Sequence, residues 1–146
     1  MMRFRALRRI KGDSGGSTIV EFGLLAPVIL ALMFGLFHVG VQLQRHNALR
    51  SIASEASRYI TVEYQKANRL NTVQMANATI AIAVGGAYML SQDDVTVDVQ
   101  LAETQRVTGA EEYTLTMTYD APNWLTFIGV KDTNLSYTRP IFVPDP

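Results

Sequence analysis

Apolar side chains dominate the chain from Phe22 to Val41, a stretch of twenty residues without a formally charged side chain. The next charge along the chain is Arg45. A helix of this length spans ~30 Å, which is the thickness of a bilayer's hydrocarbon core. The stretch therefore predicts a membrane-spanning helix, and a single acidic residue, Glu21, stands at its entrance.

The helical pattern continues beyond the apolar stretch, in residues 43–66. One apolar stripe recurs there at helical spacing and is formed by Leu49, Ile52, Ala53, Ala56, Tyr59 and Ile60. Charged and hydroxyl side chains largely avoid this stripe. We therefore expect an amphipathic continuation of the helix, whose apolar side seats a globular head.

A second helix is predicted after Asn71, because Asn71 and Gln74 have the spacing of a capping box. Its expected apolar face consists of Val73, Ala76, Ile80, Ala83, Val84 and Ala87. Gly85 and Gly86 each cost ~1 kcal/mol inside a helix relative to alanine, so the helix is expected to end or weaken there.

Alternating apolar and polar residues predict three strands after a turn at Asp93-Asp94. In the first two strands the expected buried sides are Val95, Val97, Val99 and Leu101, then Tyr113, Leu115, Met117 and Tyr119. A loop through Thr108-Gly109 joins them, most simply as an antiparallel hairpin. The third candidate is Leu135–Val143, where Pro140 indicates an edge strand. The predicted fold class is α+β, with two helices and a small antiparallel sheet of about three strands.

An apolar segment, residues 122–128, separates the last two predicted strands. Trp124 and Phe127 either complete the small core or form a patch that binds a partner. The sequence leaves both interpretations open.

Zero net charge conceals an asymmetry between the two ends of the chain. Residues 1–16 carry five basic residues and one acidic residue, a balance of +4, and the remainder carries −4. The positive end is therefore expected to stay in the cytoplasm, with the C-terminal part across the membrane. Nothing basic enough for nucleic-acid binding remains outside residues 1–16.

The residue types needed for catalysis are scarce. The chain has no cysteine, and its two histidines, His38 and His46, lie within or just beyond the apolar helix without metal-ligand companions. We therefore expect no enzyme, no cofactor and no small-molecule substrate. The exported head must also fold without disulfides.

Acidic residues gather in the second half of the chain. Five of them can lie at the ends of the predicted hairpin, namely Asp93, Asp94, Glu103, Glu111 and Glu112. A calcium site would need such oxygen ligands, but no spaced loop motif accompanies them. A solvated acidic surface is the favoured interpretation.

The pair Gly15-Gly16 ends the segment Lys11–Gly16, which precedes the apolar stretch. Glycines and short polar residues favour an extended or turning backbone, which a protease at the cytoplasmic face of the membrane requires. An ordinary signal peptide would instead place a small-residue cleavage site after the apolar core. We therefore predict cleavage between Gly16 and Ser17, with Glu21 as the fifth residue of the mature chain.

Glu21 is costly in an apolar setting, so its carboxylate is expected to be paired. Cleavage creates an α-amino group at Ser17, one helical turn or ~6 Å away. Glu21 can pair with this amine in its own chain or with that of a neighbouring subunit, which would set the register of an assembly. The alternative is a carboxylate that simply reaches the membrane boundary.

Pro27 lies inside the predicted helix and clashes with the carbonyl of Gly23. Membrane helices tolerate the resulting kink. The kink either contributes to packing in an assembly or is a harmless bend.

Residues 15–30 resemble the N-terminus of TadE-like proteins, most specifically in Val20-Glu21-Phe22 followed by Pro27. These are pseudopilins, or minor pilins, of the tight-adherence (Flp-type) pilus system. The resemblance implies cutting after Gly16 by an aspartic prepilin peptidase, and partners among other pilin-like subunits and the assembly machinery. His38 departs from the family, whose members often carry an acidic residue near this point.

The sequence thus predicts three parts: a basic leader over 1–16, a transmembrane assembly helix over 17–44, and an exported head over 45–146. The expected location is the inner membrane, in contact with membrane lipid, or a pilus. The expected role is a structural or assembly component. The competing hypothesis is an uncleaved, single-pass binding or scaffold protein.

Overall fold

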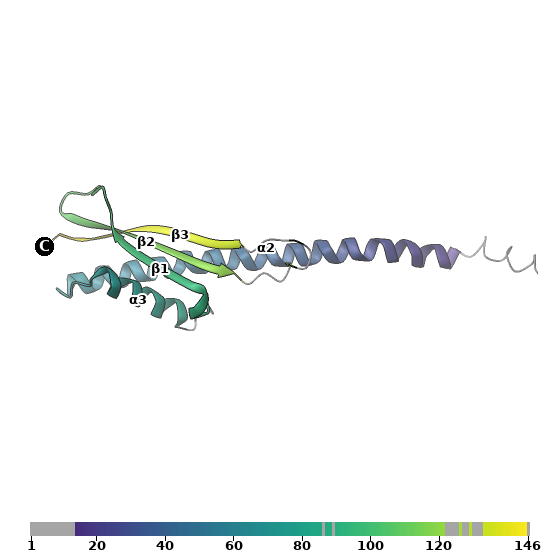
Figure 1. The fold of residues 1–146 in the computed structure, drawn as a ribbon, viewed down its shortest axis with the longest axis horizontal. Coiled ribbons are helices and arrows are strands. Elements are labelled where there is room, and N and C mark those ends of the chain that lie inside the picture. Colours follow the sequence, from purple (N-terminus) through teal and green to yellow (C-terminus); the bar gives the residue numbers. More distant parts are fainter. Residues whose placement is uncertain are drawn as a thin grey trace, which may run out of the picture. The chain divides into compact units, whose positions relative to one another are not determined.

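A computed structural model describes residues 14–85, 87–88, 90–121, 126, 129 and 133–145. In chain order the elements are α2 (Ser14–Gln65), α3 (Thr72–Val84), the short 3₁₀ helix η1 (Gln92–Asp94), β1 (Val95–Leu101), β2 (Ala110–Ala121) and β3 (Thr133–Pro144) (Figure 1). This confirms the predicted α+β class, with a long N-terminal helix, a second helix and three antiparallel strands.

The chain divides into two compact units, Met1–Val41 and Gln42–Pro146. In the first unit the described residues belong to α2, and their large apolar side chains are exposed. They are Ile19, Val20, Phe22, Leu24, Leu25, Val28, Ile29, Leu30, Leu32, Met33, Phe34, Leu36, Phe37 and Val39. Among the described residues, α2 is the helix that is long and apolar enough to cross a membrane.

The start of α2 corrects one expectation. Gly15 and Gly16 were predicted to be extended, but the helix begins at Ser14 and includes both. Extending an existing helix adds one hydrogen bond for each residue fixed, and this offsets the cost of two glycines in the first turn.

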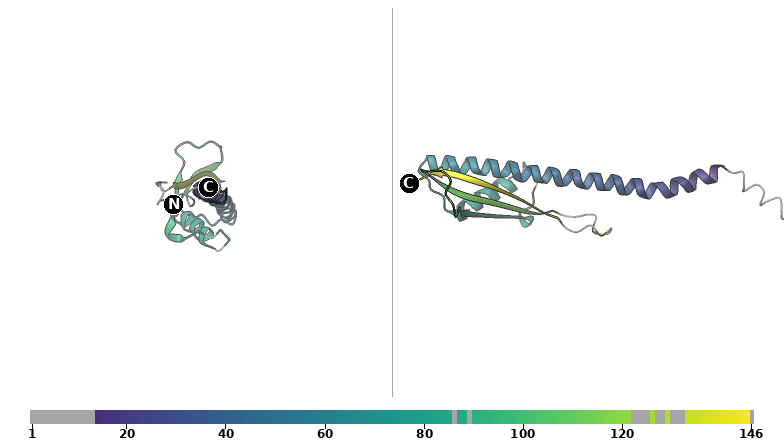
Figure 2. Two further views of the ribbon diagram at one scale, coloured as in Figure 1. Left: turned by 90° about the vertical axis from the view of Figure 1, so that its right-hand side faces the viewer. Right: turned by 90° about the horizontal axis from the view of Figure 1, so that it is seen from above.

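Pro27 lies inside α2 without ending the helix. The right-hand view of Figure 2 shows α2 bending within its purple N-terminal part, which contains Pro27. Proline removes one helical hydrogen bond and crowds the preceding turn, which is a common cause of such bends.

The second unit is built on a three-stranded sheet in the order β1-β2-β3. Both pairings are antiparallel: Val95 lies opposite Tyr119 in the first, and Tyr113 lies opposite Ile141 in the second. Pro140 therefore lies on an edge strand, as predicted, where its missing N–H breaks no ladder. The turn before β2 contains Gly109, whose φ of 81° favours glycine.

The core lies between the inner face of the sheet and the two helices. Its apolar members are Leu49, Ile52, Ala53, Ala56, Ile60, Met75, Ala83, Leu90, Val95, Val99, Leu115, Met117, Tyr119, Ala121, Ile141 and Val143. The alternation predicted for β1 and β2 is therefore correct, except that Leu101 at the end of β1 is exposed.

The stripe predicted on α2 is correct at five of its six positions. The prediction that Tyr59 is buried is wrong, because this residue is 45% exposed. Tyr59 lies at the border of the stripe, where an amphipathic ring can rest with its hydroxyl in water. Tyr64 is partly buried instead, and its hydroxyl donates to the carbonyl of Leu70 at 2.9 Å.

The capping box of α3 is confirmed: Asn71 Oδ1 accepts from the Gln74 amide at 2.8 Å, and Gln74 Oε1 accepts from the Asn71 amide at 2.9 Å. The helix ends at Val84 with Gly85 as its C-cap, also as expected.

The predicted buried face of α3 is only partly correct. Ala83 is buried as predicted and Ala76 packs against the core, but Val73 and Val84 are 65% and 40% exposed, and Ala87 lies beyond the helix. Met75 and Thr79, which were not predicted, are buried. Because α3 is apolar on nearly every side, periodicity could not select its face. Thr79 is tolerated in the core because its hydroxyl donates to the carbonyl of Met75 at 2.8 Å. Trp124 and Phe127 lie outside the described residues.

Candidate assembly and processing site

Ser17 and Glu21 lie on one side of the first turns of α2. The Ser17 hydroxyl donates to Glu21 Oε1 at 3.1 Å, and both residues are exposed. The i,i+4 spacing on a helix produces this contact directly. The local helix thus holds the carboxylate beside the residue that cleavage would turn into the new N-terminus.

Gly16, immediately before Ser17, is sterically bare. It is exposed, and a Cβ added to it would meet no atom within 4 Å other than the neighbouring backbone. A protease can reach such a position, but its backbone is helical and must be unwound before cleavage. Glycine lowers the cost of unwinding, because it is the poorest helix former apart from proline.

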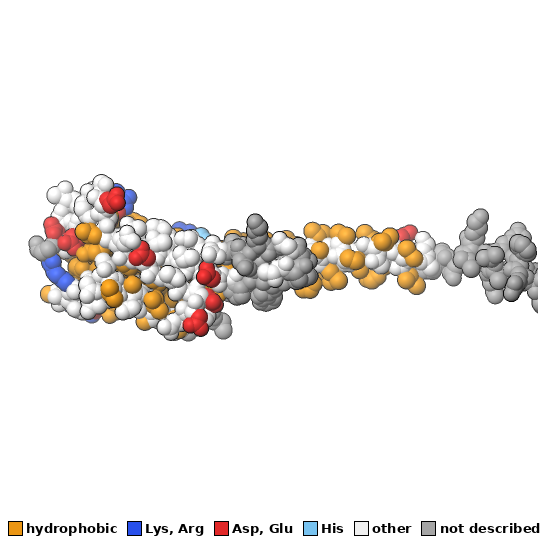
Figure 3. Space-filling view, viewed as in Figure 1, with side chains coloured by type: hydrophobic (Ala, Val, Ile, Leu, Met, Phe, Trp, Pro, Cys, Tyr) orange, Lys and Arg blue, Asp and Glu red, His pale blue; other side chains and the backbone are white. Residues whose placement is uncertain are grey.

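Gly23 and Pro27 follow on the same helix. A Cβ added to Gly23 would also meet open space. In Figure 3 the exposed apolar side chains of α2 form an orange band along the helix. A red acidic side chain lies near the start of the helix. Such a surface suits hydrocarbon or other apolar helices.

The described residues hold no group of three or more histidine, aspartate or glutamate side chains that could bind a metal ion. Glu112, one of the five acidic residues considered for calcium, is engaged by an arginine. His46 packs edge-on against Tyr137, with ring centroids 6.0 Å apart.

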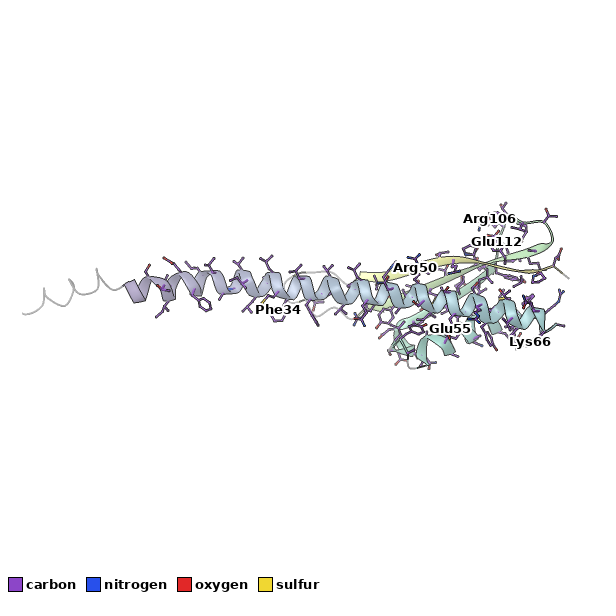
Figure 4. All side chains as sticks on the ribbon, turned by 180° about the vertical axis from the view of Figure 1, so that it is seen from behind. Phe34, Arg50, Glu55, Lys66, Arg106 and Glu112 are labelled. Carbon is purple, nitrogen blue, oxygen red and sulfur yellow. The ribbon has the colours of Figure 1, made fainter. Side chains whose placement is uncertain are left out.

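An ion pair between a buried carboxylate and an exposed arginine in the head was missed by sequence reasoning. Glu112 points to the outer face of the sheet, opposite Phe142, yet it is only 4% exposed. Arg106 Nε donates to its carboxylate at 2.9 Å, Nη2 also donates to Oε1, and the guanidinium lies 5.6 Å from the Phe142 ring centre. Figure 4 labels both partners, Arg106 in the loop that joins β1 to β2 and Glu112 near the start of β2.

Gln105 completes this arrangement. Its Oε1 accepts from the Glu112 amide at 2.6 Å, and its Nε2 donates to the carbonyl of Ala102 at 2.9 Å. These bonds tie the loop 102–109 to the start of β2, where Arg106 covers the Glu112 carboxylate. The hydrogen bonds that Arg106 donates to the Glu112 carboxylate hold the pKa of Glu112 below its ordinary value, although burial of the carboxylate opposes this. The one signal in the sequence was that Arg106 is the only basic residue between positions 70 and 130.

Polar contacts also join the head part of α2 to the sheet. Arg139 Nη1 donates to Ser54 Oγ at 3.2 Å, and the Arg45 guanidinium lies 5.6 Å from the ring centre of Tyr119. Tyr88 donates to Glu55 Oε2 at 3.0 Å from the segment after α3. These contacts tie the head part of α2 to the sheet and to the segment after α3.

Comparison with known proteins gives one match. Residues 16–58 match the family model of TadE-like proteins. The matched range starts at Gly16 and extends beyond the apolar stretch into the head part of α2. No curated protein and no solved structure matches the chain.

Proposed function

We propose that this chain, whose residues 16–58 match the TadE-like family model, is a minor pilin or pseudopilin of the tight-adherence pilus system. In this proposal a prepilin peptidase cuts between Gly16 and Ser17. The mature chain then acts as a structural or assembly component beside other pilin-like subunits.

The observation that carries the proposal is a long exposed apolar helix with a hydrogen-bonded Ser17–Glu21 pair near its start. A helix with this surface is stable only in lipid or among other apolar helices. After cleavage, the new α-amine of Ser17 would lie close to Glu21, as the Ser17 hydroxyl already does. The carboxylate can then pair with that amine or with the amine of an adjacent subunit.

The proposed location follows from charge. The basic leader, 1–16, stays in the cytoplasm, 17–44 spans the inner membrane, and the head, 45–146, lies on the far side or in a pilus. One finding favours the alternative of an uncleaved membrane-anchored scaffold, namely the helical backbone at Gly15 and Gly16.

Intact-mass and N-terminal analysis of the full chain, purified from cells with an active prepilin peptidase, tests the proposal. We expect the chain to begin at Ser17, and to keep residues 1–16 in cells without the peptidase. Gly16→Val should block cutting. Gly23→Val is the matched control, since a side chain at either glycine meets open space, and it should leave cutting intact. Recovery of Met1 or Met2 at the front of the protein in peptidase-active cells would contradict the proposal.

A further inference from the structure

The outward side of α2 within the head is basic. Arg50 and Arg58 are both exposed there and lie two helical turns apart. Ser54, whose hydroxyl accepts from Arg139 of β3, lies midway between them and is also exposed. Residues 49, 52, 53, 56 and 60 are buried on the opposite side of the helix. Figure 4 labels Arg50 on α2, viewed from behind.

The outward side of the sheet is acidic. Asp98 on β1 and Asp120 on β2 are exposed and alternate with buried residues, so they point away from α2. The remaining outward positions of β1 and β2 are mostly threonines, namely Thr96, Thr114, Thr116 and Thr118.

The two charge pairs have similar spacing. Arg50 and Arg58 are eight helical positions apart, which is ~12 Å along the axis. Asp98 on β1 lies opposite Thr116 on β2, and Asp120 follows Thr116 by four residues on β2. That places the two aspartates ~14 Å apart. Two arginines on one face therefore match two aspartates on the other within the reach of flexible side chains.

These four side chains are also free of internal ion pairs. The described ion pairs of the head are Lys66–Glu63 and Arg106–Glu112, and neither uses them. Arg106, the one basic residue at the outer face of β1 and β2, is neutralised by Glu112. Asp98 Oδ2 accepts only from the neutral amide of Gln100, at 2.7 Å. The opposite faces of a single head thus carry complementary charges that have no ion-pair partner among the described residues.

We propose that the basic face of α2 in one chain binds the acidic sheet face of a second copy, pairing Arg50 and Arg58 with Asp98 and Asp120. This contact is head-to-tail, because each chain offers two different surfaces, and it can continue from chain to chain. Exposed ion pairs are individually weak. Chains held in one membrane or assembly meet at high effective concentration, which makes weak complementary contacts sufficient. The contact goes beyond the proposed function and does not require cleavage after Gly16.

Disulfide capture between two differently tagged full-length chains tests this contact. The protein has no cysteine, so Ser54→Cys in one chain and Thr96→Cys in the other are the only thiols. Ser54 lies between the two arginines, and Thr96 lies opposite Thr118, between the two aspartates. Both chains are reconstituted together in phosphatidylcholine vesicles and mildly oxidised. We expect a mixed dimer that carries both tags.

Charge reversal then decides whether the pairing is the one proposed. Arg50→Glu with Arg58→Glu in the first chain, or Asp98→Arg with Asp120→Arg in the second, should lower mixed-dimer yield about fivefold or more, because like charges then face each other. Combining both reversed chains should restore the yield. The matched controls are Arg69→Glu and Asp93→Arg, which make the same charge changes at exposed positions outside the two faces, and these should change nothing.

Raising the salt to about 1 M should also weaken capture of the unaltered faces, because screening then acts within ~3 Å. Absence of the mixed dimer would overturn the proposal and leave the arginine face to a different protein or to anionic lipid. A dimer insensitive to charge reversal, or not restored by the double reversal, would overturn it as well. Because uncut chains are used, these outcomes are distinct from failure of the processing test.

Discussion

Glu112 shows at the scale of one residue how a tertiary contact changes the meaning of a sequence pattern. It occupies an outward position on β2, where a glutamate would ordinarily be solvated. The loop 102–109 folds over it, and Arg106 and Gln105 satisfy its carboxylate and its amide. A buried carboxylate without such partners would be strongly unfavourable.

The Glu112–Arg106 pair predicts a pH dependence. Because the folded-state pKa of Glu112 is lowered, its contribution to stability is complete above the unfolded-state value of about 4.3 and is lost as the pH falls through the lower folded-state pKa. We expect amide exchange in residues 102–109 to accelerate over that acidic range in the unaltered chain. Glu112→Gln should exchange faster already at neutral pH and show little further change on acidification.

Glu103→Gln is the control, because Glu103 is an exposed carboxylate in the same loop. It should keep the protection of the unaltered chain. Equal protection in Glu112→Gln and in the control at neutral pH would contradict the role given to the ion pair.

At the scale of elements, accuracy of prediction followed the contrast between apolar and polar positions. Arginines and serines lie between the apolar residues of the α2 stripe, so its buried side was predicted correctly at nearly all positions. In β1 and β2, apolar side chains alternate with threonines, which indicated the buried side of each strand. The helix α3 has no charged residue, so its limits were predicted through Asn71 and Gly85 while its buried face was predicted only in part. Capping is a local interaction, whereas the buried side depends on the neighbours against which the helix packs.

The border of the α2 stripe gives a matched test. Ile60 is fully buried and its neighbour Tyr59 is 45% exposed. Ile60→Ala should lower the free energy of unfolding of the head by about 2–5 kcal/mol, because it leaves a cavity in the core. Tyr59→Ala should cost less than about 1 kcal/mol. Thermal unfolding of the full chain in detergent compares the two variants, and equal losses would contradict the observed burial.

At the scale of the whole molecule, one helix serves two environments. The part of α2 before Val41 exposes apolar side chains, and the part after Gln42 contributes its stripe to a packed head. The match over residues 16–58 includes both parts. The function proposed for the chain therefore resides in the helix, which would span the membrane with its first part and carry the head on its second.

The role of Glu21 belongs to this scale, because its proposed partner is the amine of a second subunit. Glu21→Ala should leave cutting after Gly16 largely intact and should strongly reduce incorporation into pili. Glu21→Gln, which keeps the size and the capacity to accept from Ser17, should reduce incorporation as well, since it lacks the charge. Quantifying the cleaved protein in sheared pili and in membranes checks both variants, and normal incorporation of Glu21→Ala would remove the pairing argument.

The sequence by itself determined the membrane helix, the α+β class, the capping box of α3, the edge position of β3 and the TadE-like resemblance. Each of these depends on residues close together in the chain, or on a run of apolar side chains that has one stable environment. Only the tertiary structure decided which side of α3 is buried, that Gly15 and Gly16 are helical, and that a loop covers Glu112. It also placed Arg50 and Arg58 on one face of the head and Asp98 and Asp120 on the other, because such placement depends on packing between segments that are distant in sequence.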